Sequence, residues 1–135
     1  MQRVNLDRLF SVCAIILYCV ACSLPIFKED YTPGITALLR GWIGIIGGSP
    51  VFFAWLANIS FFISLFLPLK KSISRIVFSI ISILLGLTFL AVKEIPISEG
   101  GENLDVSPGI GFYFWMASFS VLLTSNILGI KKARG

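Results

Sequence analysis

Four long apolar runs, none containing an acidic residue, constrain this chain more than any other feature. The runs cover residues 9–26, 51–69, 73–92 and 109–130. Each is close to the roughly 20 residues with which an α-helix crosses a hydrocarbon layer of about 30 Å. Strands would be shorter, and a membrane barrel would need an alternation of polar and apolar positions that these runs lack. We therefore expect an all-α polytopic membrane protein with four transmembrane helices in a single domain, residues 1–135.

Charged side chains are too few to surround a soluble core. They make up 13% of the chain, against roughly 25% in soluble domains, while 56% of the residues are hydrophobic and the mean hydropathy is +0.92. The net charge of +4 does not indicate nucleic-acid binding, because the basic residues lie between apolar runs. The chain has no histidine, the commonest general base and metal ligand. We expect no nucleic-acid partner, no metal and no cofactor.

The basic residues predict the orientation in the membrane. Two precede the first run, three lie between the second and third runs or at the start of the third, and three follow the fourth: Arg3, Arg8, Lys70, Lys71, Arg75, Lys131, Lys132 and Arg134. The other two loops hold the remaining three bases and six of the seven acids. The positive-inside rule then places both termini in the cytoplasm of a multi-pass protein, which we assign to a bacterial inner membrane. Aromatic clusters at residues 52–55 and 112–115 fit a belt at the outer surface.

An additional apolar segment at about residues 35–48, between the first two runs, is too short to span a bilayer. Three large residues recur along it at helical spacing, and three glycines recur on a second face: Leu38, Trp42 and Ile45, then Gly41, Gly44 and Gly48. Two interpretations remain open. The segment is either an outer interfacial helix with Arg40 extending to the headgroups, or a re-entrant element that docks a partner. In both, the glycines would permit a close approach of helices.

Small residues repeat every seven positions in two of the runs, which is typical of helix-packing faces in membranes. They comprise Ser79 and Gly86 with the adjacent Ser82, and Gly111, Ser118 and Ser125. Because a loop joins the third and fourth runs, these helices must be antiparallel, and the two faces are expected to meet. Asn58 in the second run is expected to donate or accept hydrogen bonds across helices. The alternative is a polar pathway for a substrate, although hydroxyl groups alone rarely form one.

The sequence offers little support for catalysis or coupled transport. The small multidrug transporters have a similar length and four helices, but that family relies on a glutamate embedded in its first helix, and here no acid lies within a run. Cys19 and Cys22 form a C-x-x-C near the end of the first run. Four-helix quinone reductases that generate disulfides need a second cysteine pair, and residues 93–108 contain no cysteine. We therefore expect a protein that is not an enzyme.

Three short motifs occur in the order GWIG at residues 41–44, AWLAN at 54–58 and GFYFWMASF at 111–119. In this order the chain resembles small four-span inner-membrane proteins of bacteria. The resemblance covers most of the chain and implies the four-span fold, but it implies no activity. The chain departs from the pattern at Ile59, where proline would be expected.

These observations lead to three hypotheses about function. The first is a non-enzymatic accessory or structural subunit of a larger inner-membrane complex, with lipid and an integral-membrane protein as partners. The second is an immunity-type membrane protein that neutralises a pore-forming toxin. The third and weakest is a thiol oxidoreductase that uses Cys19 and Cys22.

Overall fold

The computed structural model describes residues 5–46, 49–96 and 100–134, so that the predicted packing residue Gly48 lies outside the described residues. The elements in chain order are α1 (Leu6–Ser23), α2 (Gly34–Arg40), the 3-10 helix η1 (Gly41–Ile45), α3 (Pro50–Phe66), η2 (Leu69–Lys71), α4 (Ser72–Leu87), η3 (Thr88–Ala91), β1 (Glu94–Pro96), β2 (Asn103–Asp105) and α5 (Ile110–Arg134).

Three helical stretches are long and apolar enough to cross a membrane: Leu6–Ser23, Leu69–Ala91 and Ile110–Lys131. A fourth candidate is the bent pair formed by Gly34–Ile45 and Pro50–Phe66. The expected helical polytopic fold is thus confirmed, with up to four candidate spans among the described residues.

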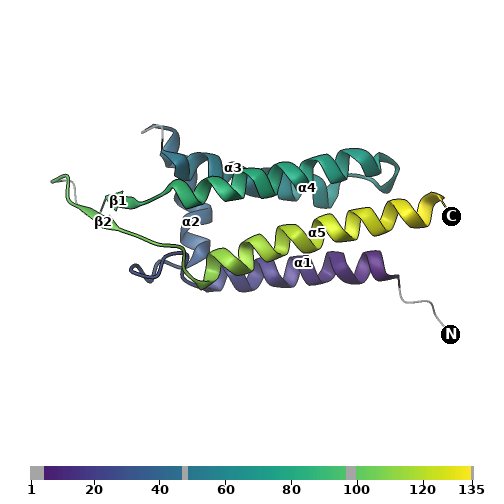
Figure 1. Ribbon diagram of the computed structural model, residues 1–135, viewed down its shortest axis with the longest axis horizontal. Helices are drawn as coiled ribbons and strands as arrows, with labels where there is room; N and C mark the ends of the chain where they lie inside the picture. Colours follow the sequence, from purple (N-terminus) through teal and green to yellow (C-terminus); the bar gives the residue numbers. More distant parts are fainter. Residues whose placement is uncertain (1–4, 47–48, 97–99, 135) are drawn as a thin grey trace.

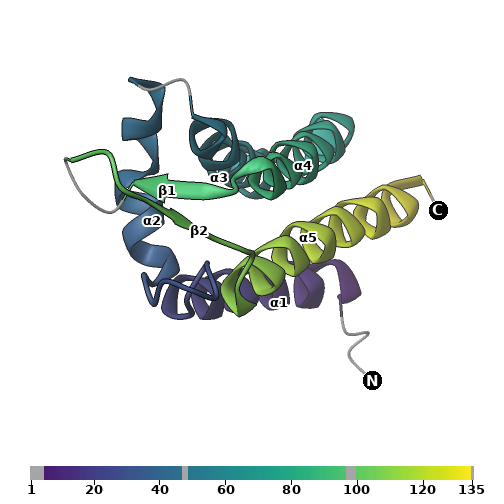
Figure 2. The same cartoon turned by 60° about the vertical axis from the view of Figure 1, so that its left-hand side comes forward.

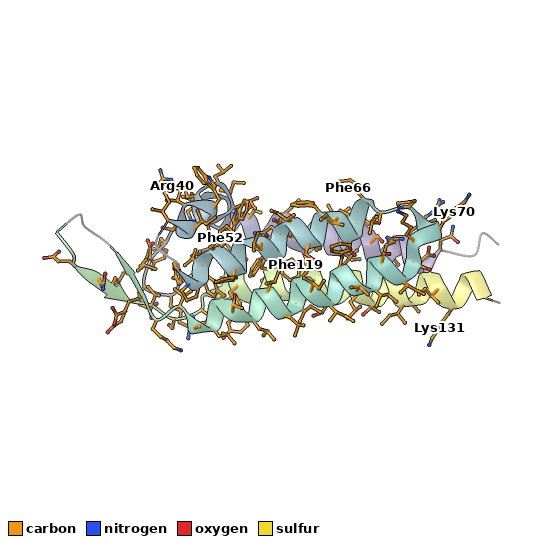
Figure 3. All side chains as sticks on the ribbon, turned by 90° about the horizontal axis from the view of Figure 1, so that it is seen from above. Arg40, Phe52, Phe66, Lys70, Phe119 and Lys131 are labelled. Carbon is orange, nitrogen blue, oxygen red and sulfur yellow. The ribbon has the colours of Figure 1, made fainter. Side chains whose placement is uncertain are left out.

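The long helices form two antiparallel pairs. Helix α1 packs along α5, α3 packs along α4, and contacts between α4 and α5 join the two pairs (Figures 1 and 2). Both termini lie at one end of the bundle, which we call the terminal end. Helix α2 and the two strands lie at the opposite end, which we call the hairpin end (Figure 1). In Figure 3, Lys70 and Lys131 lie near the terminal end, and Arg40 and Phe52 lie toward the hairpin end.

Aromatic rings packed against small residues form the core in the middle of the bundle. The Tyr18 ring from α1 stacks on the Phe61 ring from α3, with centroids 4.9 Å apart, and Phe61 lies 5.2 Å from the ring of Phe119 in α5. Ala14 and Ala57 are fully buried beside them. Small residues leave room for the rings, which provide much of the buried contact between helices.

Proline residues determine where α1 ends and where α3 begins, and a capping serine also marks the start of α3. Helix α1 ends at Ser23, three residues before the expected end of the first run, because Leu24 is extended ahead of Pro25. Helix α3 begins after Ser49, whose hydroxyl accepts a hydrogen bond from the Val51 N–H, with Pro50 in the first turn.

The loop between α4 and α5 forms a hairpin that the sequence analysis did not predict. Glu94–Pro96 pairs antiparallel with Asn103–Asp105, and Gly101 in the connection has φ +84°, a conformation that favours glycine. Strands of three residues are too short to show a recognisable alternation of polar and apolar side chains.

The loop that follows α1 is bonded to the segment that precedes α5. The backbone carbonyls of Pro25 and Ile26 accept hydrogen bonds from the N–H groups of Gly111 and Gly109, at 2.9 and 2.7 Å. These donors lie at the start of a helix, where no carbonyl of the same helix is available to them. At Gly111 a Cβ atom would lie 2.7 Å from the Pro25 carbonyl oxygen, so that glycine permits this approach.

A carboxylate outside the helices strengthens the same connection. Glu29 accepts hydrogen bonds from the Ser107 N–H at 2.7 Å and from the Ser107 hydroxyl at 2.6 Å. These bonds stabilise the ionised form and hold the pKa of Glu29 below its ordinary value.

Candidate functional site

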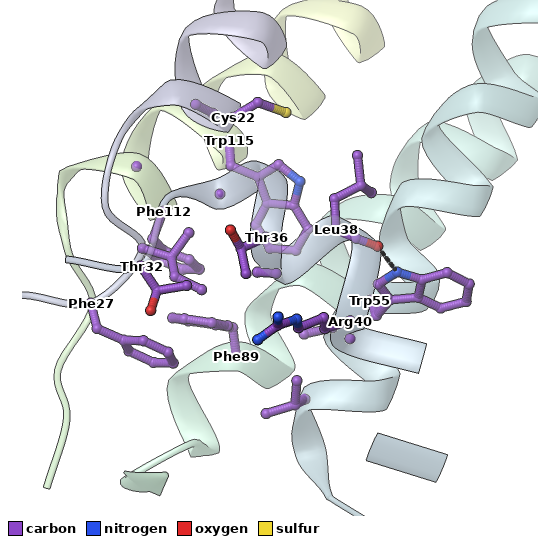
Figure 4. A pocket seen from close by; sticks show the side chains of 18 of the residues that line it. Cys22, Phe27, Thr32, Thr36, Leu38, Arg40, Trp55, Phe89, Phe112 and Trp115 are labelled. Carbon is purple, nitrogen blue, oxygen red and sulfur yellow. Dashed lines mark hydrogen bonds between the residues drawn. The ribbon is translucent and has the colours of Figure 1, made fainter. Parts of the chain in front are cut away.

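A cavity of about 290 Å³ lies within the hairpin end, where the long helices meet α2 and η1 (Figure 4). Much of its wall is aromatic and apolar: Phe27, Ala54, Phe89 and Phe112 are all buried and belong to one cluster. The Phe89 ring stacks between Phe27 and Phe112, with centroid distances of 5.1 and 5.0 Å. The interior therefore suits an apolar group.

Helix α2 and η1 cover one side of this cavity and are fixed to α3. The Trp55 indole N–H donates to the Leu38 carbonyl at 2.7 Å (Figure 4). A Cβ atom at Gly41 would lie 2.6 Å from the Trp55 ring, and one at Gly44 would lie 3.1 Å from the Phe52 backbone nitrogen. Two of the three predicted glycines therefore lie directly against α3.

The predicted stripe of Leu38, Trp42 and Ile45 divides between the cavity and the exterior of the protein. Leu38 is half-buried and lines the cavity, whereas Trp42 and Ile45 are exposed. The helix tightens at Gly41 from α to 3-10 geometry, or from about 3.6 to about 3.0 residues per turn, which rotates the later side chains off the stripe. Whether the described part of this segment lies on the membrane or re-enters it stays a prediction.

Asn58 lies at the inner end of the cavity and connects three helices. Its Oδ1 accepts hydrogen bonds from the Tyr18 hydroxyl of α1 and the Trp115 indole of α5, both at 2.8 Å. Its Nδ2 donates to the Trp55 carbonyl at 3.0 Å. The polar groups at this end of the cavity are thus occupied by one another.

Two side chains of opposite charge line the cavity, Arg40 and Asp30. The Asp30 carboxylate accepts from the Thr32 hydroxyl at 2.6 Å and from the Thr32 N–H at 3.3 Å. Arg40 is exposed, lies beside Phe89 in Figure 4, and has no hydrogen bond or ion pair with any described residue. Sequence reasoning singled out Arg40 only as a residue extending to headgroups, and it missed Asp30.

A second polar group lies in the terminal half of the bundle. The hydroxyls of Ser64 and Ser79 are 2.7 Å apart, and Asn126 Nδ2 donates to both, at 2.9 and 2.8 Å. Ser64 also donates to the Arg75 carbonyl, and the Arg75 guanidinium donates back to the Ser64 carbonyl. Asn126 Oδ1 is buried without a partner. Asn126 was not among the predicted packing residues, although an amide within an apolar run is the signal that could have identified it.

A cavity of about 310 Å³ lies at the terminal end, bordered by polar and charged residues that include Asp7, Arg8, Arg75 and Ser125. Ser125 donates to the Asp7 carbonyl at 2.6 Å and lies 2.7 Å from the Ser11 hydroxyl. Ser125 therefore connects α5 to α1 rather than to α4.

The other predicted packing residues are all buried. A Cβ atom at Gly86 would lie 2.6 Å from the Met116 sulfur, so that α4 and α5 approach closely there. Ser82 and Ser118 have their hydroxyls bonded to carbonyls of their own helices. Gly111 contacts the loop after α1 instead of α4.

Within the part of the chain that the structure describes, no three His, Cys, Asp or Glu side chains lie together as metal ligands would. Cys13, Cys19 and Cys22 carry free thiols, and Cys22 borders the hairpin-end cavity.

No protein-family model matches the chain, and neither a curated protein nor a solved structure shows detectable similarity to it.

Proposed function

We propose that this chain is a non-enzymatic accessory subunit of a larger complex in the bacterial inner membrane, and that it binds an integral-membrane partner through the exposed side of α2 and η1. The observation that carries the proposal is that this segment has two unlike sides. One side is bonded to α3 through Trp55 and through the close contacts of Gly41 and Gly44. The other side is largely exposed in the part of the chain that the structure describes.

That free side is apolar and already ordered. It consists of Leu39, Trp42, Ile43, Ile45 and Ile46, of which Leu39 and Ile46 are 67% and 83% exposed. The Trp42 indole donates to the Leu39 carbonyl at 2.9 Å, which fixes the orientation of the ring. An ordered apolar surface loses little conformational entropy on association, and tryptophan is enriched at the energetic centres of interfaces.

The distribution of charge supports an outward-facing position for this surface. Basic residues Lys70, Lys71 and Lys131 lie near the terminal end, whereas acids gather in the loops of the hairpin end. Under the positive-inside rule the terminal end is cytoplasmic. The partner would then contact the chain at the outer leaflet.

Site-specific photocrosslinking in native membranes tests the proposal. A photoreactive residue would replace Trp42 or Ile46, and matched controls would carry it at Ile15 of α1 or Val77 of α4, which are also exposed apolar positions. We expect one discrete protein adduct from Trp42 and Ile46, absent from the controls, and co-purification of that protein in fixed stoichiometry with the unmodified chain.

Adducts with lipid alone, or the same adducts from all four positions, would contradict the proposal. An adduct formed only in cells that produce a pore-forming toxin would replace the accessory-subunit proposal with the immunity-type hypothesis.

A further inference from the structure

The hairpin-end cavity has an interior whose deeper hydrogen-bonding side chains are already paired, whereas the Thr36 hydroxyl on its wall is unpaired among the described residues. Asn58, Tyr18 and Trp115 are bonded to one another, and the Trp55 indole is bonded to Leu38. The surrounding wall is formed largely by apolar side chains and aromatic rings. Transfer of a hydrocarbon chain to the aromatic wall of Phe27, Phe89 and Phe112 is favourable, whereas a polar group among these rings would lose its water without gaining a partner.

The charged side chains of the same cavity have the opposite character. Arg40 has no partner among the described residues, so all of its guanidinium donors are available. Asp30 uses each carboxylate oxygen once, toward Thr32, and each oxygen has remaining capacity as an acceptor. No ion pair joins Arg40 to Asp30 in the described part of the chain. A ligand that carries both an anion and a cation would satisfy both side chains.

The size of the cavity limits how much of a ligand it holds. At about 290 Å³ it lies at the lower limit of small-molecule pockets, which range over about 300–1,000 Å³. This space accommodates part of one acyl chain and excludes two complete chains. The rest of a lipid would remain in the bilayer, which the apolar exterior of α1 and α3 adjoins.

We infer that the cavity is a binding site for a single zwitterionic phospholipid with a primary ammonium group, of the phosphatidylethanolamine class. Its phosphate would contact Arg40 and its ammonium Asp30, while the upper part of one acyl chain would occupy the space bordered by Phe27, Phe89 and Phe112. A primary ammonium suits Asp30 better than a quaternary one, because only the former donates hydrogen bonds to a carboxylate. This site does not depend on the proposed protein partner.

Native mass spectrometry of the full-length chain in detergent provides the test. Phosphatidylethanolamine, phosphatidylcholine and phosphatidylglycerol with identical acyl chains would be titrated separately, and the fraction of protein with one bound lipid would be measured. We expect a single saturable phosphatidylethanolamine adduct, with affinity about tenfold or more above those of the other two lipids, as one charge-assisted hydrogen bond would give. Equal affinities for the three lipids would overturn the proposal.

Substitutions distinguish this site from general lipid adhesion. Arg40→Gln should weaken phosphatidylethanolamine binding about tenfold or more, and Asp30→Asn should remove the preference over phosphatidylglycerol while it retains an acceptor for the Thr32 N–H. Lys70→Gln is the matched control at the other end of the bundle and should change neither. Equal losses for Lys70→Gln and Arg40→Gln, or no loss for Arg40→Gln, would overturn the proposal.

Two further measurements serve as controls. One tests whether the substitutions change the stability of the fold, and the other tests whether the ligand is a lipid or a soluble compound with the same headgroup. Thermal unfolding should be similar for Arg40→Gln, Lys70→Gln and the unsubstituted chain when lipid is absent. Glycerophosphoethanolamine, which has the headgroup without acyl chains, should not displace the lipid at equal concentration. Equal displacement would show that a soluble phosphate compound, and not a lipid, is the ligand.

Discussion

Replacing Asn58 with leucine should test whether one side chain holds three helices together. Leucine has a similar size but makes no hydrogen bonds, so that the Tyr18 hydroxyl and the Trp115 indole would lose their acceptor. Measured interhelical hydrogen bonds in membranes average about 0.6 kcal/mol and reach about 1.7 kcal/mol. Loss of two should therefore lower the free energy of unfolding by about 1–3 kcal/mol.

A double-mutant cycle with Tyr18→Phe separates the hydrogen bond from packing. Tyr18 is buried and stacks on Phe61, and phenylalanine keeps that ring in place. Tyr18→Phe should destabilise the unsubstituted chain by about 0.6–1.7 kcal/mol. In the Asn58→Leu chain it should cost almost nothing, because the hydroxyl there has no acceptor to lose.

The assay is unfolding in mixed micelles as the mole fraction of dodecyl sulfate rises, followed by circular dichroism and by tryptophan fluorescence. Tyr113→Phe is the matched control, since Tyr113 is exposed on α5, and it should have the same small effect in both backgrounds. A penalty for Tyr18→Phe that is unchanged by Asn58→Leu would refute the assignment of the hydrogen bond.

Four other predictions concern the loops, the topology and the thiols. In the same unfolding assay, Gly111→Ala should destabilise the fold, because a Cβ atom there would collide with the Pro25 carbonyl. Gly129→Ala should not destabilise it, because a Cβ atom there would meet nothing within 4 Å. The Glu29 carboxyl should titrate by carbon NMR below its ordinary pKa of 4.5, and Ser107→Ala should raise the midpoint. Because the folded pKa is lowered, the connection to Ser107 should contribute stability above the ordinary pKa and lose it as the pH falls through the lowered one; an unmoved midpoint would contradict this. Single cysteines at Lys71 and Glu102, in a chain whose three native cysteines are replaced by alanine, should be labelled from opposite sides of the membrane, and labelling from one side would exclude the bundle as described. Replacing Cys19 and Cys22 together by alanine should leave unfolding and partner binding unchanged. A reducible Cys19–Cys22 disulfide in the unsubstituted chain whose loss abolishes binding would show that the thiols act.

The long helices could be predicted because a hydrocarbon layer imposes one length and one composition on each span. Residues 109–130 are predominantly apolar and contain no charged residue, and most of α5 coincides with them. The hairpin strands have no such constraint, because three residues cannot display a period. The change of helix type at Gly41 also escaped prediction, since it depends on how closely the Trp55 ring approaches the backbone.

The candidate site was less predictable than the fold for a related reason. Asn58 was identifiable because a lone amide in an apolar run needs a partner within the protein. Asp30 and Arg40 lie in different segments, and only the folding of α2 back over the long helices brings both to one cavity. The spacing of Asp30 and Arg40 along the chain does not predict that both side chains line one cavity.

The pairing of α1 with α5 determines the order in which the bundle is completed during synthesis. Ser11 and Asp7 of the first helix contact Ser125 of the last, across more than a hundred residues. The first helix therefore enters the membrane long before its main neighbour exists, and lipid or an insertion factor must cover its packing face until then. The carbonyls of Pro25 and Ile26 likewise lack their hydrogen-bond donors, the N–H groups of Gly111 and Gly109, until those residues have been synthesised. A chain interrupted before residue 110 would lack both contacts, so that α1 completes its packing only after α5 has been synthesised.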